Sequence, residues 1–197
     1  MHSKYIIVIP ARAGSKRFVG KNKQLLNGLP LFMHSVNAAK PIPNALVVLS
    51  TDDLDIINYC EHNSIEYVHR FPFLALEYSA KQDVIIDACE FMWESHMSTA
   101  DVVISLQANS PQVTTELLLK GINLFESHEP VNGCKEFICI NSDGKQNGSI
   151  RIMTYKTVFQ KSLSTYVGSF TSDLIDVHTL DDFNQVQIAW ASRNSRV

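Results

Sequence analysis

The residues best suited to chemistry lie in one short loop near the start of the chain. Residues 5–9 (YIIVI) are apolar and rich in β-branched side chains, which predicts a buried strand. Pro10 ends that strand because proline has no N–H to donate to a sheet. The loop that follows contains no acid, and its cations and small residues are Arg12, Ala13, Gly14, Ser15, Lys16, Arg17, Gly20 and Lys21.

A strand that leads into a small, basic loop is one way in which α/β proteins build a polyphosphate site. Glycine lets the backbone approach the ligand, and successive N–H groups can bind an anion. Arginine offers a planar fork for two oxygens, whereas lysine offers a mobile point charge. The loop matches neither GxxxxGK[ST] nor GxGxxG. The alternative, a solvated basic turn, is disfavoured because four cations beside a buried strand are poorly placed for a surface turn.

The composition of the chain limits its function. The 197 residues are 45% hydrophobic, which is enough for one sizeable core, so we expect a single domain over residues 1–197. A net charge of -3 argues against a general affinity for nucleic acid or membranes. Neither a signal peptide nor a run of roughly 18 apolar residues is recognisable, so we expect a cytoplasmic protein. The four cysteines form no CxxC pair, which indicates buried, reduced thiols rather than a zinc site.

Apolar runs alternate with helix-like patterns along the chain. Strands are expected at residues 5–9, 45–49, 65–69, 101–106, 136–140, 149–154 and 174–177. Helices are expected at residues 31–40, 54–62, 82–94, 114–125 and 180–191. This alternation predicts βαβ units, and therefore an α/β fold with a doubly wound, mostly parallel sheet in three Rossmann-like layers.

Ligands of such folds bind at the edge of the sheet where the carboxyl ends of the strands lie. That rule brings four loops together, at residues 10–22, 50–53, 107–111 and 176–182. Asp52 and Asp53, within the second of these loops, are interpreted as the cap of the helix at 54–62.

Five segments carry a more specific pattern. They are residues 9–39 (IPARAGSKRFVGKNKQLLNGLPLFMHSVNAA), 48–53 (VLSTDD), 70–85, 106–111 (LQANSP) and 176–183 (DVHTLDDF). In this order and approximate spacing they resemble the cytidylyltransferases that activate nine-carbon α-keto acid sugars, the CMP-sialic acid synthetase (acylneuraminate cytidylyltransferase) family. The first segment is quite specific, and the others are specific only together. The resemblance covers nearly the whole chain and implies a nucleotidyltransferase fold.

The resemblance implies that CTP reacts with a nonulosonate sugar, such as a sialic, legionaminic or pseudaminic acid, to give the CMP-sugar and pyrophosphate, with Mg²⁺ as cofactor. Charge must then be stabilised on the leaving phosphates. The catalytic candidates for that role are Arg12, Lys16 and Lys21. The nucleotide-binding candidates are Ala11 beside the cytosine, the amides of Ala13, Gly14 and Ser15, and the side chains of Asn22, Arg70 and Gln107. The metal candidate is Asp176.

The chain departs from the family pattern in four places. One is the family's serine-rich segment, which is reduced here to residues 78–81 (YSAK). His178 stands where a second carboxylate would bind Mg²⁺, and imidazole is a poor ligand for that ion. Gln112 and Val113 replace a Leu-Arg pair, which removes a cation from the sugar side. Residues 126–175 are abbreviated where family members carry an arm for dimerisation and sugar binding. The resemblance nevertheless implies a homodimer.

Three functions therefore stay open. The favoured one is a CMP-nonulosonate synthetase. A second uses an eight-carbon keto acid or another nucleotide, although LQANSP argues against the eight-carbon branch, which tends to carry an acid there. A third is a catalytically weakened, nucleotide-binding paralogue with a regulatory role, motivated by His178 and Gln112. Without the resemblance, Arg70 would be interpreted as a surface arginine paired with Glu66.

Overall fold

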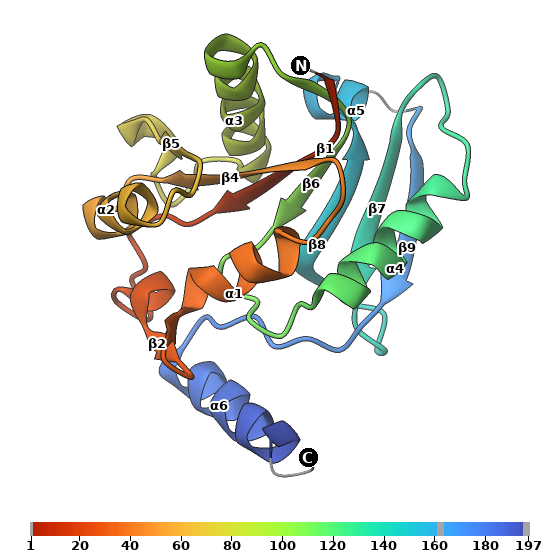
Figure 1. The fold of residues 1–197 in the computed structure, drawn as a ribbon. Coiled ribbons are helices and arrows are strands. Elements are labelled where there is room, and N and C mark those ends of the chain that lie inside the picture. The colour runs from red at the N-terminus through yellow and green to blue at the C-terminus, as the bar shows by residue number, and fades with distance from the viewer. Residues whose placement is uncertain (1, 161–163, 195–197) are drawn as a thin grey trace.

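The computed structural model describes residues 2–160 and 164–194, which are built around one large β-sheet (Figure 1). The strands of the described residues are β1 (His2–Pro10), β2 (Leu25–Leu26), β3 (Leu29–Pro30), β4 (Ala45–Thr51), β5 (Tyr67–His69), β6 (Thr99–Leu106), β7 (Lys135–Ile140), β8 (Gln146–Thr154) and β9 (Tyr166–Thr171), of which β2 and β3 form a separate hairpin. Its α-helices are α1 (Leu31–Ala39), α2 (Leu54–His62), α3 (Lys81–His96), α4 (Thr115–Glu126), α5 (Tyr155–Phe159) and α6 (Leu180–Asn194). Short 3₁₀ turns occupy Lys21–Lys23 and Pro72–Leu74.

The sheet has seven strands in the order β5-β4-β1-β6-β8-β7-β9. β1 lies between β4 and β6 and pairs in parallel with both, and β4 also pairs in parallel with β5. β8 runs antiparallel to β6 and β7, while β7 and β9 are parallel. The predicted α/β fold with a mostly parallel sheet is thus confirmed.

Helices cover both faces of this sheet, with α1 and α4 on one side and α3 and α5 on the other (Figure 1). Alternate residues of β1 belong to two hydrophobic cores, one on each face of the sheet, because successive side chains of a strand point to opposite faces. Ile7 packs in one core with Phe32 and Phe125, and Ile6 packs in the other with Ile85. Burial on both faces explains why residues 5–9 form an unbroken apolar run.

The carboxy-terminal helix α6 packs against the small β2–β3 hairpin rather than on the large sheet. Phe183 and Val186 of α6 form a separate apolar cluster with Leu26 of that hairpin. Thr179 caps the helix: the Asp182 N–H donates to Thr179 Oγ1 at 3.2 Å, and the Thr179 N–H donates to Asp182 Oδ2 at 2.8 Å. This reciprocal pair fixes the direction in which the chain leaves the 176–179 segment.

Several local predictions differ from the structure. The strand expected at residues 174–177 is wrong. There the Val177 N–H donates to the Asn109 carbonyl at 2.8 Å, and Asn109 Nδ2 donates back to the Val177 carbonyl at 2.9 Å. The segment is therefore hydrogen-bonded to the 107–111 loop and not to the sheet. Strand β9, helix α5 and the β2–β3 hairpin were not predicted.

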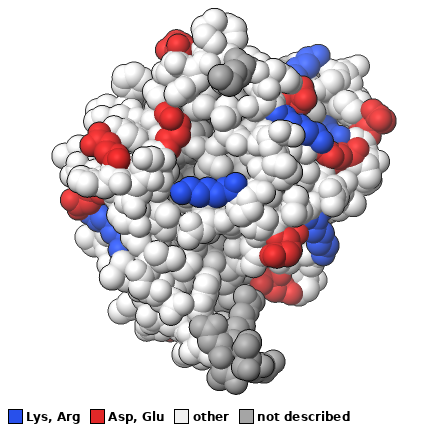
Figure 2. All heavy atoms as spheres, in the orientation of Figure 1, with Lys and Arg blue, Asp and Glu red and all other residues white. Residues whose placement is uncertain are grey.

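The prediction of buried, reduced cysteines is confirmed. The cysteines, all buried and free, lie in α2, in α3, just before β7 and in β7: Cys60, Cys89, Cys134 and Cys139. In the described part of the chain, no helix combines the length and apolar character needed to cross a membrane. On the face shown in Figure 2, the described Lys and Arg side chains lie scattered among Asp and Glu and form no broad basic surface.

Candidate functional site

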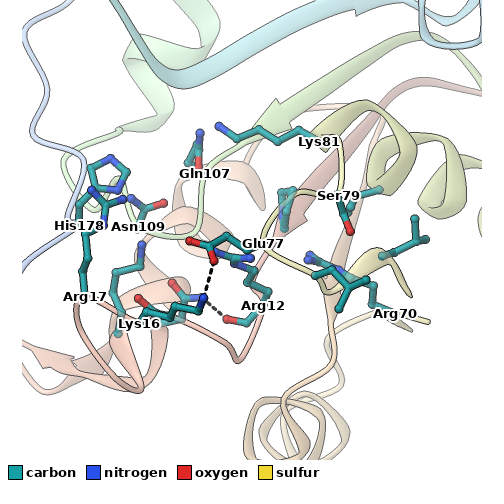
Figure 3. Close-up of a pocket in the computed structure, with 17 residues that line it drawn as sticks. Arg12, Lys16, Arg17, Arg70, Glu77, Ser79, Lys81, Gln107, Asn109 and His178 are labelled. Carbon is teal, nitrogen blue, oxygen red and sulfur yellow. Dashed lines mark hydrogen bonds and ion pairs between the residues drawn. The ribbon is translucent and has the colours of Figure 1, made fainter. Parts of the chain in front are cut away.

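A cavity of about 490 Å³ lies at the carboxyl ends of the central strands. It brings together side chains from segments far apart in the sequence, and most of them are polar or charged (Figure 3). The predicted site residues that line it are Arg12, Ser15, Lys16, Lys21, Asn22, Arg70 and Gln107. The predicted residues outside its lining are Ala11, Ala13, Gly14 and Asp176.

The loop cations crowd one end of this cavity. Burial and the neighbouring guanidinium of Arg17 lower the pKa of Lys21 to about 8. Lys16 instead points toward the cavity mouth, where its Nζ forms an ion pair with Glu77 Oε2 at 2.6 Å. Both partners are largely exposed, so solvent screens this pair strongly. The loop therefore offers a dense positive charge that is only weakly neutralised by the protein itself.

The loop backbone is already hydrogen-bonded in part. The Ala13 N–H donates to Asp52 Oδ1 at 2.8 Å, and the Ser15 N–H donates to the Ala13 carbonyl at 2.8 Å. An incoming phosphate would have to replace these bonds to use either amide. Ala11 is fully buried, and its N–H donates to the Ser50 carbonyl at 2.8 Å. Ala11 therefore holds the loop on β4 from outside the cavity lining.

The two acids after β4 have separate roles. Asp53 caps α2, because its carboxylate accepts from the Asp55 N–H at 3.0 Å. Asp52 does not share this role, contrary to the sequence interpretation, since its carboxylate accepts from Ala13 as described above. Asp52 thus ties the candidate phosphate loop to the neighbouring strand.

Asn22 lines the cavity with a buried side chain that has one unpaired acceptor. Its side chain is only 7% exposed, and its Nδ2 donates to the Arg12 carbonyl at 3.1 Å. Its Oδ1 is buried and has no hydrogen-bond partner among the described residues. A buried acceptor without a donor is costly, so this atom is suited to receive an N–H or O–H group from a ligand.

Arg70 is held rigidly at the wall between β4 and the cavity. It is 4% exposed, with Nε donating to Ser50 Oγ at 3.1 Å and Nη2 donating to the Ser50 carbonyl at 2.8 Å. Burial lowers its pKa to about 10, while the carboxylate of Asp52 acts in the opposite direction. The alternative pairing with Glu66 is wrong, because Glu66 contacts His96 instead.

The part of the cavity around Gln107 lies within electrostatic reach of the loop, because the carboxylate of Asp176, just behind the lining, acts to raise the pKa of Lys21. The Gln107 N–H donates to the Ser149 carbonyl at 3.0 Å, and the Gln107 carbonyl accepts from Ser35 Oγ at 2.7 Å. Asp176 Oδ1 accepts from Ser149 Oγ at 2.9 Å and also from Ser110 Oγ. Burial raises the pKa of the Asp176 carboxyl despite these two hydrogen bonds.

Residues 6–166 match the protein family described as Cytidylyltransferase. The chain belongs to the cytidylyltransferase family. The sheet and helices agree with the solved structure of a CMP:2-keto-3-deoxy-manno-octonic acid synthetase in complex with CTP, at a TM-score of 0.75 and 15% identity over 97% of this chain and 100% of that one. At that identity the likeness concerns the fold.

Curated relatives of this cytidylyltransferase match at low identity. A CMP-N,N'-diacetyllegionaminic acid synthase of Legionella pneumophila is 35% identical over 55% of this chain and 47% of its own length. A 3-deoxy-manno-octulosonate cytidylyltransferase of Wigglesworthia glossinidia brevipalpis is 27% identical over 57% of this chain and 44% of its own length. The chain thus matches less than half the length of these relatives. Their names cover different keto-acid sugars, so the argument from LQANSP against the eight-carbon branch stays a prediction.

The side chains near Asp176 can hold a divalent ion only when phosphate oxygens supply most of its ligands. Among the described residues there is no group of three or more His, Cys, Asp or Glu side chains that could hold a metal. Asp176 Oδ1 is occupied by two serine hydroxyls, which leaves Oδ2 as its free oxygen. Burial and the ammonium of Lys21 lower the pKa of His178, and its imidazole supplies no negative charge to a metal in either protonation state. Asp176 would therefore provide a single oxygen ligand.

Sequence reasoning missed several of the residues that line the cavity. Those not selected as site candidates are Arg17, Glu77, Ser79, Lys81, Asn109 and His178. Lys81 directly precedes the helix predicted at residues 82–94, and in the structure it is the first residue of α3, where the helix dipole disfavours a cation. Glu77 and Ser79 lie in an irregular loop without periodicity, and nothing in that stretch pointed to the cavity.

Proposed function

We propose that this cytidylyltransferase transfers CMP from CTP to the anomeric hydroxyl of a keto-acid sugar, and that the sugar is a nonulosonate of the sialic, legionaminic or pseudaminic acid kind. One observation carries the proposal: a single cavity joins the cations of the 12–21 loop to Gln107, with Asp176 directly behind it. The triphosphate of CTP needs the cations, and the polar sugar needs Gln107 and Asp176.

The chemistry follows from this arrangement. The oxygen of the sugar hydroxyl forms a bond to the α-phosphorus and its proton is released to solvent, while the bond between that phosphorus and the bridging oxygen to the β-phosphate breaks. Pyrophosphate leaves with the bonding electrons, so negative charge accumulates on the β- and γ-phosphates. Arg12, Lys16 and Lys21 stabilise that charge, since they lie at the loop end of the cavity. Asn22 Oδ1 accepts a donor group of the nucleotide.

Arg70 and Gln107 orient the substrates from opposite walls. Arg70 is fixed by Ser50, so its guanidinium keeps one orientation as the nucleotide binds. A Mg²⁺ ion held by the phosphates and Asp176 Oδ2 would neutralise further charge on the triphosphate. We also propose a homodimer in the cytoplasm, which light scattering on the purified protein and fractionation of the source cells would test.

The specific alternative is a weakened paralogue that binds CTP without transferring CMP. Two observations favour it. His178 lines the cavity where a second acid was expected. Gln112 has a structural role, because its Oε1 accepts a hydrogen bond from the Ile175 N–H at 2.8 Å.

Calorimetry and a pyrophosphate assay separate these functions. The protein is titrated with CTP with and without Mg²⁺, and pyrophosphate release is then followed with N-acetylneuraminate, a legionaminic acid and 3-deoxy-manno-octulosonate. CTP binding with release on a nine-carbon acid supports the proposal. CTP binding without pyrophosphate release on any acid supports the paralogue. Pyrophosphate release with the eight-carbon acid alone would show that the substrate is that acid and not a nonulosonate. A protein that does not bind CTP overturns both functions.

A further inference from the structure

Lys81 is a cation in the cavity that the loop site does not use. It is the first residue of α3, and its side chain reaches into the cavity toward Gln107 (Figure 3). Among residues 2–160 and 164–194, no hydrogen bond or ion pair engages Lys81 Nζ. A lysine in the first turn of a helix is repelled by the helix dipole. Burial lowers the pKa of Lys81, and the carboxylate of Asp176 offsets this effect only in part. A second anion in the cavity would therefore stabilise the charged lysine further.

The three polar groups at this end of the cavity converge on Gly148. A Cβ atom on Gly148 would lie 3.2 Å from Gln107 Nε2, 3.8 Å from Asp176 Oδ2 and 3.8 Å from Lys81 Nζ. Gln107 Nε2 and Lys81 Nζ are both donors, and neither has a hydrogen-bond acceptor in the described part of the chain. Both side chains line the cavity, so two donors without acceptors lie near each other on its wall and are available to an anionic group of a ligand.

The start of α3 is held firmly in place. Gln82, the residue after Lys81, donates from Nε2 to the Val158 carbonyl at 2.6 Å. Its Oε1 accepts from Arg151 Nη1 at 2.5 Å, and Arg151 in turn pairs with Glu136. These bonds connect the helix to strands β7 and β8, so the Lys81 side chain extends from a fixed point.

We propose that Lys81, together with Gln107 Nε2, binds the carboxylate of the keto-acid acceptor. The inference rests on the proposed function and assigns to Lys81 the preference for a sugar that carries a carboxylate. In a keto-acid sugar, the carbon that carries the attacking hydroxyl also carries the carboxylate. That carboxylate must lie near Asp176 and would be repelled by it, unless a cation is present at this end. The loop cations serve the triphosphate at the other end, and Lys81 serves the acid.

The test compares acids with their neutral counterparts. Calorimetry is carried out in the presence of α,β-methylene-CTP, whose α–β bridge is not cleaved, with N-acetylneuraminate, 3-deoxy-manno-octulosonate and the C1 carboxamide of each. The wild-type protein is expected to bind at least one acid about ten- to a hundredfold more tightly than its carboxamide, the size of one charge-assisted contact. Lys81→Gln should abolish that preference, and Lys81→Arg should retain most of it.

Binding of the nucleotide analogue is measured on its own as a second readout. Lys81→Gln should change it less than threefold. The matched control Lys40→Gln should change neither readout, because Lys40 is the C-cap of α1 and does not line the cavity.

Preference for the acid that persists in Lys81→Gln overturns the inference and leaves the proposed function standing. So does a loss of analogue affinity with the preference intact, which would assign Lys81 to the nucleotide. A wild-type protein that binds neither analogue nor acids overturns both proposals, and one that binds only the analogue overturns the acceptor assignments.

Discussion

The two ends of the cavity are built in different ways. At the loop end, charge is dense but loosely held: Lys16 has only an exposed partner in Glu77, and Arg12 makes no side-chain hydrogen bond or ion pair to the described residues. At the Gln107 end, charge is sparse but fixed, because Asp176 accepts from two serine hydroxyls.

This difference suggests a division of labour. A triphosphate presents many oxygens, so mobile cations can stabilise it in several arrangements. An attacking hydroxyl must be placed accurately, and a 1 Å displacement can cost about 10²-fold in rate, so its end of the cavity needs fixed groups. The loop end should therefore respond to charge, and the Gln107 end to geometry.

The largest effect is expected for Arg12→Ala at the loop end. Removing one group that stabilises developing charge should lower kcat/KM by about 10²–10³-fold. The thermal midpoint should change little, because the guanidinium has no hydrogen bond or ion pair to the described residues. Steady-state kinetics and a thermal melt check both statements, with Lys40→Ala as the control. A wild-type rate in Arg12→Ala would remove Arg12 from the phosphate site.

A smaller effect is expected for His178→Asp at the other end. A second carboxylate beside Asp176 should strengthen divalent-ion binding, since oxygen ligands suit Mg²⁺ better than imidazole. We expect the Mg²⁺ concentration for half-maximal turnover to fall about tenfold, the size of one added charge-assisted contact. The titration of rate against Mg²⁺ measures this, with His178→Asn as the uncharged control. An unchanged Mg²⁺ dependence would mean that His178 does not face the metal.

CTP affinity should also depend on pH through Lys21. Its pKa of about 8 lies below that of a solvated lysine, because burial and Arg17 disfavour its charge. As the pH rises from 7 to 9, the unliganded protein loses this positive charge, and the affinity for CTP should fall by up to about tenfold. Calorimetry across that range gives the curve. Lys21→Arg should flatten it, and an affinity that stays constant in the wild type would contradict the role of Lys21.

The smallest effect concerns the pair at the cavity mouth. Glu77→Gln removes the carboxylate that competes with phosphate for Lys16, so CTP affinity should rise about two- to threefold at low salt. The gain should vanish at high salt, because exposed charges are screened. A drop in affinity would mean that Glu77 supports the loop rather than competes with the ligand.

The sequence predicted the elements whose structure follows from their own residues alone. Residues 5–9 and 101–106 are apolar throughout, and a strand buried on both faces is the economical way to cover them. β9 gave no such signal, because its burial alternates and its sequence contains Gly168, which lies under the ring of Phe137. The strand predicted at 174–177 failed because Asn109, a residue about 70 positions earlier, takes its hydrogen bonds.

The sequence by itself determined that a basic loop follows a buried strand, since four cations within ten residues stay close in space whatever the rest of the chain does. The rule for parallel sheets also placed residues 107–111 and 176–182, with Gln107 and His178, at the same edge as that loop. Only the tertiary structure showed that Lys81, from the start of α3, reaches the cavity beside them. Long-range convergence of this kind depends on strand order, which local sequence patterns do not encode.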